Sequence, residues 1–301
     1  MKRHLSFLLV ALAALAALAT LAALTTPLFA QKKVERKLAV GMEASIRIHN
    51  MVGSVVVRGW NKDTVLARAT LGAGDEFHMG GGYTGAKMFV ESSDERSPKP
   101  TRLEVWVPAR VRLWVKTATA SIEVSGVSGG LDLYVVSGTI DVMGSPRELN
   151  AEAIDGDIHI AGSPPWLRAK SATGAITFRG ASADMALSTV SGPIRVEGGA
   201  FERVKIETVT GNITFGGQLV RSGAFDFDSH GGTVDIAIPE KTNASFVVVT
   251  IAGRIDNRLS RTRPVAGRFG RGQELTTEAG DGGARVSVRT FKGPVTLRRT
   301  P

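Results

Sequence analysis

Cysteine is absent from the 301 residues of this chain, and tyrosine occurs only twice. The lack of cysteine excludes a disulfide framework, a thiolate metal site and a cysteine nucleophile. It also excludes a lipid anchor attached to an N-terminal cysteine. Charged residues make up only 22% of the chain and hydrophobic residues 43%. Such a chain can bury a core, so its composition is typical of a folded protein.

An apolar segment stands at the N-terminus. It begins with Lys2 and Arg3 and continues over residues 5–26 as a Leu/Ala-rich run without a charge. A basic start followed by an apolar run predicts a secretory signal over residues 1–30, and hence a location in the periplasm, at the cell surface or outside the cell. The run approaches the ~20 residues that span a bilayer, so retention as a membrane anchor is the alternative. Removal of the segment lowers the formal net charge from +9 to +7, because it takes away two bases and no acid.

An internal repeat organises the rest of the chain. Glycine recurs about every 18 residues and is preceded and followed by alternating apolar residues. Counted from the first apolar residue of a copy, the apolar residues or their substitutes stand at offsets 0, 2, 4, 5, 9 and 11, and the glycine stands at offset 7. The template fits ten segments, which are 46–57, 113–124, 131–142, 149–160, 167–178, 185–196, 204–215, 225–236, 246–257 and 286–297. Nine of them carry the glycine, as Gly53, Gly138, Gly156, Gly174, Gly192, Gly211, Gly232, Gly253 and Gly293, and the tenth has Ala120.

The repeat predicts the fold class. Alternation at period two indicates strands with one buried face. The alternation changes phase between offsets 4 and 5, which requires a corner, and glycine two residues later suits a tight bend. A unit of about 18 residues has no room for a helix, so successive units are expected to stack in parallel, about 4.8 Å apart. We therefore predict an all-β parallel β-helix, or β-solenoid, right-handed by the general chirality of parallel crossovers and preceded by the N-terminal signal helix.

The domain organisation follows from the same pattern. Residues 31–301 are expected to form one solenoid domain, most regular over 113–215. Two insertions interrupt the repeat. The first, 58–112, contains strand-like pieces around a glycine-rich loop, and the second, 258–285, is rich in Arg, Gly and Pro and predicts a mobile loop.

A family resemblance supports this fold. The phrase Gly-Ser-Val-Val-Val-Arg-Gly-Trp over residues 53–60, the later Val-Pro-Ala of 107–109 and the serial Ser/Thr/Asp-Gly-x-Ile-x-Val units resemble the bacterial "putative adhesin" family. Related domains are called head-GIN or autotransporter-adhesin-like. The resemblance covers about residues 40–301 and implies export and a β-solenoid. Its motifs are structural repeats without a catalytic signature, and a fold does not by itself define a function.

Candidate chemistry lies on the outward-facing columns of the stack. Stacking places Asp141 and His159 in one ladder, with Asp155 and Asp157 close by. Carboxylates beside a histidine are what a polysaccharide-cleaving enzyme or a cation site needs. The alternative is an ordinary solvated face, because outward strand positions are usually polar and this column lacks the dense acidic set of a catalytic cleft.

Two further patterns have simpler explanations. Threonine and serine recur at offsets 4 and 6, which admits an ice-binding array, but hydroxyls at a corner also bond the turn backbone. His230 occupies offset 5, where the other copies carry mostly apolar residues, and predicts a buried neutral histidine rather than a metal ligand. No second ligand stands at metal-binding spacing and no phosphate loop opens a helix, so no metal or other cofactor is expected.

The C-terminal end is basic. Residues 254–301 contain 11 Lys and Arg against 4 acids. Candidate ligand residues in this part are Arg258, Arg261, Arg263, Arg268 and Arg271. Such a patch suits anionic envelope polymers, including cell-wall glycans, lipopolysaccharide or the acidic faces of lipids, and another envelope protein is a further candidate partner. The alternative is a solvated, cap-like end that binds no ligand. Nucleic acid is not expected, because the compartment excludes it and aromatic residues are not interleaved with the bases.

The sequence thus favours an exported, non-enzymatic, adhesin-like scaffold of the cell envelope that binds a glycan or a protein. Two alternatives stay open. One is a carbohydrate-active β-helix enzyme, with Asp141, Asp155 and Asp157 as its first candidate residues. The other is an envelope-stress or sensing protein that is held to the membrane by an uncleaved N-terminal segment.

Overall fold

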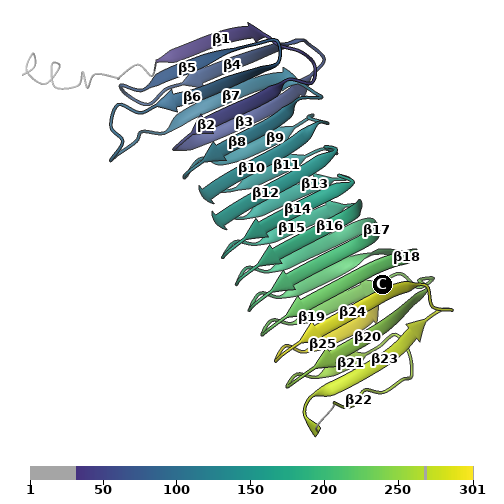
Figure 1. Cartoon of the computed structure of the whole chain (residues 1–301). Coiled ribbons are helices and arrows are strands. Elements are labelled where there is room, and N and C mark those ends of the chain that lie inside the picture. The colour runs from purple at the N-terminus through teal and green to yellow at the C-terminus, as the bar shows by residue number, and fades with distance from the viewer. Residues whose placement is uncertain (1–31, 268–269, 301) are drawn as a thin grey trace, which may run out of the picture.

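The computed structural model describes residues 32–267 and 270–300, and these form an all-β molecule (Figure 1). Their 25 strands join into one mixed sheet that folds into two layers. The expected signal segment 1–30 lies outside the described residues. Within the described residues, no helix has the length and apolar character needed to cross a membrane. The prediction of an all-β fold is therefore confirmed.

Most strands come in pairs joined by a corner, and we call each such pair a rung. In order of hydrogen bonding, the first layer contains β5 (Glu76–Gly82), β6 (Gly85–Glu91), β2 (Ser45–Asn50), β8 (Arg112–Thr117), β10 (Gly130–Ser137), β12 (Glu148–Asp155), β14 (Trp166–Ser171), β16 (Ser182–Thr189), the second halves of β17 (Ile194–Thr208) and β18 (Ile213–Ser229), β24 (Ala284–Thr290), β20 (Ala244–Thr250), β23 (Gln273–Ala279) and β22 (Val265–Ala266). The second layer contains β1 (Lys33–Ala39), β4 (Thr64–Thr70), β7 (Thr101–Pro108), β3 (Gly53–Trp60), β9 (Ser121–Ser125), β11 (Ile140–Met143), β13 (Ile158–Gly162), β15 (Ile176–Gly180), the first halves of β17 and β18, β19 (Val234–Ile238), β25 (Val295–Arg299) and β21 (Ile255–Asn257).

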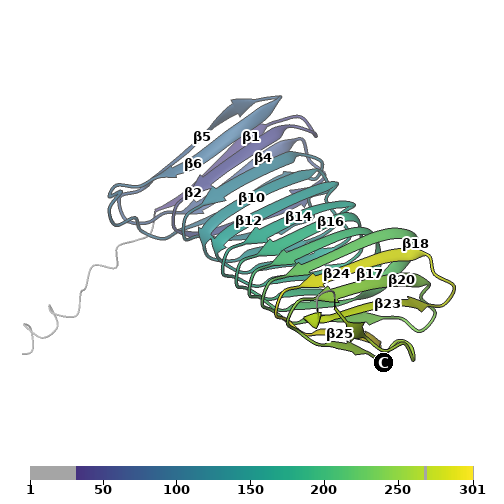
Figure 2. The ribbon, with the colours of Figure 1, turned by 60° about the horizontal axis from the view of Figure 1, so that its bottom comes forward.

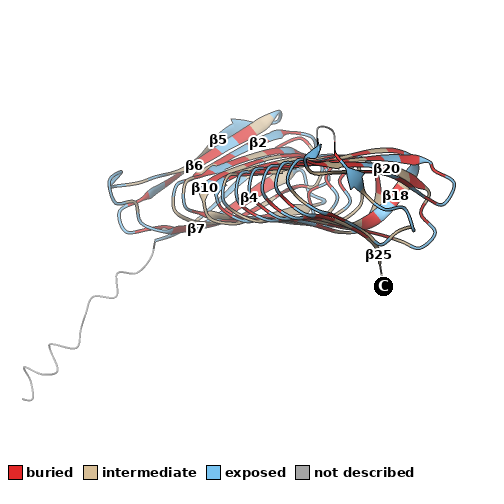
Figure 3. Ribbon diagram, turned by 90° about the horizontal axis from the view of Figure 1, so that it is seen from below, coloured by how far each residue is buried: buried red, intermediate tan, exposed pale blue. Residues whose placement is uncertain are grey.

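Central rungs pair in parallel at the spacing of the sequence repeat. Leu131 pairs with Leu149 and Leu149 with Leu167, each time one full repeat further along the chain. Residues at offsets 0, 2, 4, 9 and 11 point into a core that runs the length of the stack, and Figure 3 colours the buried positions of the ribbon red. Its centre is aromatic, with Phe215 packed 5.3 Å from both Phe201 and Phe227, centroid to centroid.

The corner after offset 4 is held by a repeated hydroxyl contact. Thr189 Oγ1 donates to the carbonyl oxygen of Gly192 at 2.6 Å, and Thr290 Oγ1 does the same to Gly293 at 2.7 Å. In another rung Thr208 Oγ1 instead accepts from the backbone N–H of Gly211 at 2.9 Å. The hydroxyls at offset 4 therefore lie inside the stack and bond the turn backbone, so they form no outward ice-binding array.

Two expectations about the corner are wrong. The apolar residue at offset 5 does not belong to the core, because offsets 5 and 6 both point outward and the phase shift is completed only at the glycine. His230 is accordingly exposed rather than buried, and its ring stacks on Phe291 at 4.8 Å between centroids.

The order of the rungs differs from the order of the chain at both ends. Segment 286–297 pairs with 225–236 on one side and with 246–257 on the other, so the last copy of the repeat is inserted between two earlier ones. At the other end, 46–57 lies between the rung made by β6 and β7 and segment 113–124. The expectation that successive copies stack in the order of the chain is therefore wrong at both ends of the molecule.

Antiparallel strands cover both layers at the N-terminal end and the first layer at the C-terminal end. At the N-terminal end β5 pairs with β6, while β4 pairs with β7 and carries β1 on its far side. At the other end β23 covers β20 and is flanked by β22. Segment 258–285, expected to be a mobile loop, thus contributes an ordered edge strand. Reversal of direction at the ends covers the strand edges that would otherwise invite pairing with another chain.

The repeat glycines are required by close backbone approach between rungs. A Cβ added at Gly192 would lie far inside van der Waals contact of the Gly174 carbonyl, and Gly174 meets Gly156 in the same way. A second glycine column, which the sequence template missed, stands at the other corner, where Gly162 and Gly180 have φ of 150° and 146°.

We expect Gly192→Ala to lower the free energy of unfolding by about 2 kcal/mol or more, because the added methyl group can only be accommodated by separating two rungs. Urea denaturation followed by circular dichroism measures the change. Gly82→Ala is the matched control, since a Cβ at Gly82 meets nothing within 4 Å. Equal midpoints for the two variants would contradict the close approach.

Candidate functional site

The predicted ladder of Asp141 and His159 is present. The two residues are partners in the parallel pairing of β11 with β13, and Thr177 and Arg195 continue the column. The hollow beside them has a volume of only about 150 Å³ and is also lined by Arg179. Among the described residues, no group of three or more His, Asp or Glu side chains is arranged to hold a metal ion.

Asp155 and Asp157 lie at the corner between β12 and β13 and bond the next rung. Asp155 accepts a hydrogen bond from the hydroxyl of Thr173, and Asp157 accepts one from the backbone N–H of Ala175 at 2.7 Å. These carboxylates thus link rung to rung. The structure places all four candidates in neighbouring rungs without converging them on an enclosed cavity.

The arginine-rich segment is mostly exposed, and part of its charge is neutralised. Arg258 forms an ion pair with Asp256 at 2.6 Å. Arg261, Arg263 and Arg271 are exposed. Arg268 lies outside the described residues. Nearby, Arg298 pairs with Asp235 at 2.9 Å and Arg289 with Asp228 at 2.7 Å, so acids from other rungs offset much of the basic C-terminal end.

A more elaborate surface lies on the first layer near the N-terminal end, on the face turned to the viewer in Figure 2. Trp114 of β8 and Tyr134 of β10 approach to 6.1 Å between ring centroids, and His49 of β2 lies 4.7 Å from Trp114. The strand register explains this group. Arg47 pairs with Trp114, and His49 pairs with Lys116, two residues after Trp114 on the same strand. Three consecutive rungs therefore supply a half-buried row of rings.

Two adjoining hollows flank these rings. The first, of about 630 Å³, is lined by Ser45, Arg47, His49, Lys87, Arg112, Trp114 and Asp132. The second, of about 390 Å³, is lined by Arg112, Gly130, Leu131, Asp132, Glu148, Asn150, Trp166, Arg168 and Lys170. They share Arg112 and Asp132, which form an ion pair at 3.3 Å. We call the surface made by both hollows and Tyr134 the aromatic face.

Trp166 marks the far end of the aromatic face. Its ring is 38% exposed and lies beneath the guanidinium of Arg168, 4.4 Å from the centroid. Arg168 is held in place by Asp184 at 2.7 Å, and Arg203 contacts the same carboxylate at 3.0 Å. Burial opposes ionisation of Asp184, but hydrogen bonds from the two arginines outweigh it and lower the pKa of this carboxyl.

Electrostatics on the aromatic face favour an anion. The hollows carry more bases than acids, and their bases are Arg47, Lys87, Arg112, Arg168 and Lys170. Partial burial lowers the pKa of His49, and the positive charges of Lys87, Lys116 and Arg47 lower it further. Burial also raises the pKa of Tyr134, whose hydroxyl accepts a hydrogen bond from the Asn150 amide at 3.2 Å. The aromatic face therefore presents uncharged rings directly beside the positive charges of its lysines and arginines.

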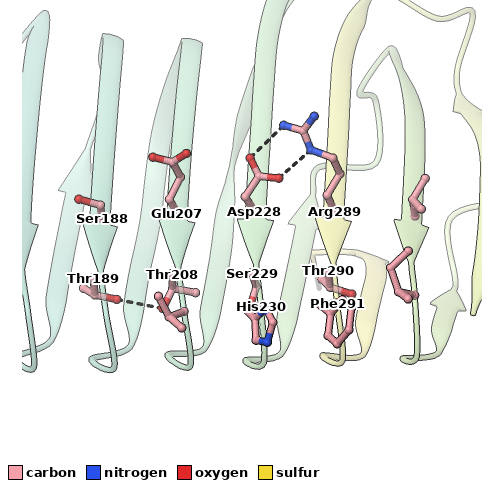
Figure 4. Close-up of a pocket in the computed structure, with 13 residues that line it drawn as sticks. Ser188, Thr189, Glu207, Thr208, Asp228, Ser229, His230, Arg289, Thr290 and Phe291 are labelled. Atoms are coloured by element: carbon pink, nitrogen blue, oxygen red, sulfur yellow. Dashed lines mark hydrogen bonds and ion pairs between the residues drawn. The ribbon is translucent and has the colours of Figure 1, made fainter.

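A different hollow, of about 550 Å³, lies at the corner near the C-terminal end (Figure 4). It is lined by the offset-5 residues Val209, His230, Phe291 and Ile251 and by polar side chains that include the Asp228 and Arg289 ion pair. The apolar members are between 42% and 46% exposed. This hollow is one end of a longer exposed column.

Sequence reasoning missed both surfaces for identifiable reasons. Trp114 and Tyr134 stand in two copies of the repeat and Trp166 directly precedes a third, and only the register shows that they share one face. The sequence contained part of that signal, because Trp114 and Tyr134 stand at outward offsets, but among the outward strand columns only the charged column of the second layer was treated as a candidate for ligand chemistry. The offset-5 column was assigned to the core because its residues are apolar.

Comparison with known proteins finds distant structural neighbours only. No family model and no curated protein sequence matches the chain. Among solved structures, it is similar to a "putative cell adhesion protein" from Clostridium sporogenes (8% identity, TM-score 0.25, covering 89% of this chain and 100% of that one). It is also similar to a "putative adhesin" from Bacteroides fragilis (13%, 0.36, 90% and 98%) and a "putative lipid binding protein" from Parabacteroides distasonis (10%, 0.34, 90% and 97%). Similarity at this level does not extend to function.

The lowered pKa of His49 has a consequence for stability. Below the usual histidine pKa of about 6.5 the unfolded chain takes up a proton at this residue before the folded chain does. The contribution of His49 therefore lowers stability as pH falls from about 6.5 toward its folded pKa. We expect His49→Gln to lose less unfolding free energy than the parent chain between about pH 7 and pH 5, measured by urea denaturation. An equal loss in both chains would contradict this assignment.

Proposed function

We propose that this chain is an exported, non-enzymatic β-solenoid of the cell envelope that binds an anionic glycan on its aromatic face. The observation that carries the proposal is the row of His49, Trp114 and Tyr134 beside two adjoining hollows rich in bases. Trp166 extends the surface by two rungs beyond Tyr134. From His49 to Trp166 the face spans five rungs, or ~19 Å at the usual strand spacing, which suits an extended chain of sugars rather than a single small molecule.

Architecture and compartment support the same proposal. Parallel pairing at the spacing of the repeat is what a coil of stacked rungs produces, and it makes one long rigid surface. The basic, apolar N-terminal segment supports export, which would place that surface among envelope polysaccharides. The resemblance to adhesin-like proteins noted in the sequence agrees with a binding role.

The chemistry of the aromatic face fits an acidic sugar. Flat aromatic rings offer large apolar area with a defined orientation, against which the apolar face of a sugar ring packs. The guanidinium of Arg112 suits a carboxylate or sulfate group. Arg168 is already bonded to Asp184 and adds positive charge beside Trp166. The amide of Asn150 and the carboxylates of Asp132 and Glu148 supply partners for sugar hydroxyls. Binding by these groups needs no bond-breaking residue.

The placement of Asp141, Asp155 and Asp157 supports a non-enzymatic role. Both corner carboxylates already accept hydrogen bonds from the next rung. The hollow beside Asp141 is small, and the cationic side chain of Arg179 also lines it. Glycoside cleavage requires an acid and a second carboxylate on either side of one bond, in a cleft that holds the sugar between them.

A glycan-binding assay of the full-length chain tests the proposal. We expect binding to glycans that carry carboxylate or sulfate groups, weaker binding at high salt, and roughly tenfold to hundredfold weaker binding for Trp114→Ala and Trp166→Ala. Trp106→Ala is the matched control, because Trp106 lies in the second layer on β7, where Arg58 and Arg68 cover its ring. Its affinity should be unchanged.

Three results would overturn the proposal. Full affinity in both Trp114→Ala and Trp166→Ala would remove the aromatic face as the binding site. If binding were lost instead when Arg261, Arg263 and Arg271 are changed to Ser, the ligand would be bound at the C-terminal end. Release of shortened glycan by the parent chain, lost in Asp141→Asn, would replace a binding role with an enzymatic one.

A further inference from the structure

One column of exposed apolar side chains follows the whole stack. It contains the residue at offset 5 of each copy of the repeat, and we call it the edge column; its stacking order is Met51, Ala118, Val136, Ile154, Ala172, Val190, Val209, His230, Phe291 and Ile251. Ile154 is 58% exposed, Met51 55% and Val190 53%. Scattered apolar side chains are normal on a protein surface, but a contiguous file of them marks an interaction site.

The edge column is long, straight and regularly spaced. Ten rungs at the usual strand spacing make it ~43 Å long. Backbone bonds from Ala118 to Met51 and from Val190 to Ala172 show that its members occupy successive rungs at the corner. Beside it runs the outward offset-3 column, with offset 4 turned inward between them, as Figure 4 shows for Glu207, Asp228 and Arg289. An apolar file is thus flanked by a polar one.

We propose that the edge column is the interface of an antiparallel homodimer, with the two-fold axis passing between the rungs of Ile154 and Ala172. A second copy is the partner that shares the ~4.8 Å repeat of the column, so its side chains stay in register over many rungs. The side chains of a packed helix, which rises about 1.5 Å per residue, would not stay in register with this repeat. The end strands β4, β23 and their neighbours leave the side of the stack as the surface available for this pairing.

Charge selects this register. With the axis between Ile154 and Ala172, the offset-3 residues meet in complementary pairs: Lys116 faces the partner's Glu207, and Glu152 faces the partner's Lys170. Tyr134 faces the partner's Ser188. The dimer therefore covers the rim of the aromatic face at Tyr134 and His49, while Trp114 and Trp166 lie outside the covered strip. Glu207 already contacts Lys205 at 2.8 Å, so Lys116 adds a second cation to that carboxylate.

The competing arrangements place like charges together. Moving the axis by one rung toward the C-terminal end sets Lys116 against the partner's Arg289 and Glu152 against the partner's Glu207. A parallel pair, with the axis along the stack, sets Glu152 against the partner's Asp155. Like charges across an interface disfavour an arrangement and so specify the alternative.

The proposed dimer also occupies the corner hollow. Eight rungs overlap, from Met51 to His230, and the partner's Met51 then lies at the rung of His230, on the rim of the 550 Å³ hollow. A strip of eight rungs is ~34 Å long and, over offsets 3 to 6, ~13 Å wide, or ~440 Å² per partner. This area is below the ~800 Å² per partner of a standard interface, so we expect a weak, reversible dimer.

Crosslinking tests the register, because the chain has no cysteine of its own. The full-length double variant Lys116→Cys/Glu207→Cys is treated at micromolar concentration with a bismaleimide shorter than the ~24 Å that separates these two residues within one chain. We expect a covalent dimer on a denaturing gel. Each single cysteine variant should give none, since equivalent positions lie five rungs apart across the antiparallel interface.

A second substitution tests the apolar contact. Adding Ile154→Asp to the double-cysteine chain should reduce crosslinking at least tenfold, because it buries two unpaired charges at the axis. Met143→Asp is the matched control: this side chain is 64% exposed but lies on the second layer, and crosslinking should persist. All variants share the N-terminal segment, so association through that segment cannot distinguish them. Equal dimer from a single cysteine variant, or from the Ile154→Asp chain, would overturn the proposal.

Discussion

Close approach between consecutive backbone turns is the constraint on which the rest of this molecule depends. The carbonyl of one corner glycine occupies the space that a side chain on the next would fill, as between Gly174 and Gly192. Hydroxyls such as Thr189 then fix the corner from inside. Because rungs are held this tightly and in one register, outward residues fall into straight columns. Both binding proposals concern those columns, one across a sheet face and the other along an edge.

Much of the architecture was predictable because the repeat records two physical requirements, burial at period two and room for a backbone at the corner. The template correctly placed strands such as Leu131–Val135 and the glycine column. It failed at offset 5, where Ile154 is apolar and yet exposed, because hydropathy cannot distinguish a core from an interface. It also failed on stacking order, since copies of one repeat look alike in sequence whichever neighbours they contact.

The candidate site was less predictable than the fold. Trp114 and Tyr134 become neighbours only once their pairing is known, and Trp166 joins them two rungs beyond Tyr134. Of the charged residues that sequence reasoning favoured, Asp157 accepts a hydrogen bond from the backbone of the next rung and Asp155 accepts one from a hydroxyl there. In a stacked molecule, a polar residue at a corner is as readily part of the scaffold as part of a site, and only its hydrogen-bond partner separates the two.

The interleaved ends have a consequence for how the chain assembles and comes apart. A simple stack adds units in the order of synthesis and frays from either end. Here segment 286–297 completes the contacts of 225–236 and 246–257, so the C-terminal quarter can close only after nearly the whole chain has emerged. Such long-range closure raises the contact order and slows the final folding step. Once it is in place, the inserted rung pairs with a strand pair on each side. A chain that ended before this rung would leave the facing strand edges of 225–236 and 246–257 unpaired.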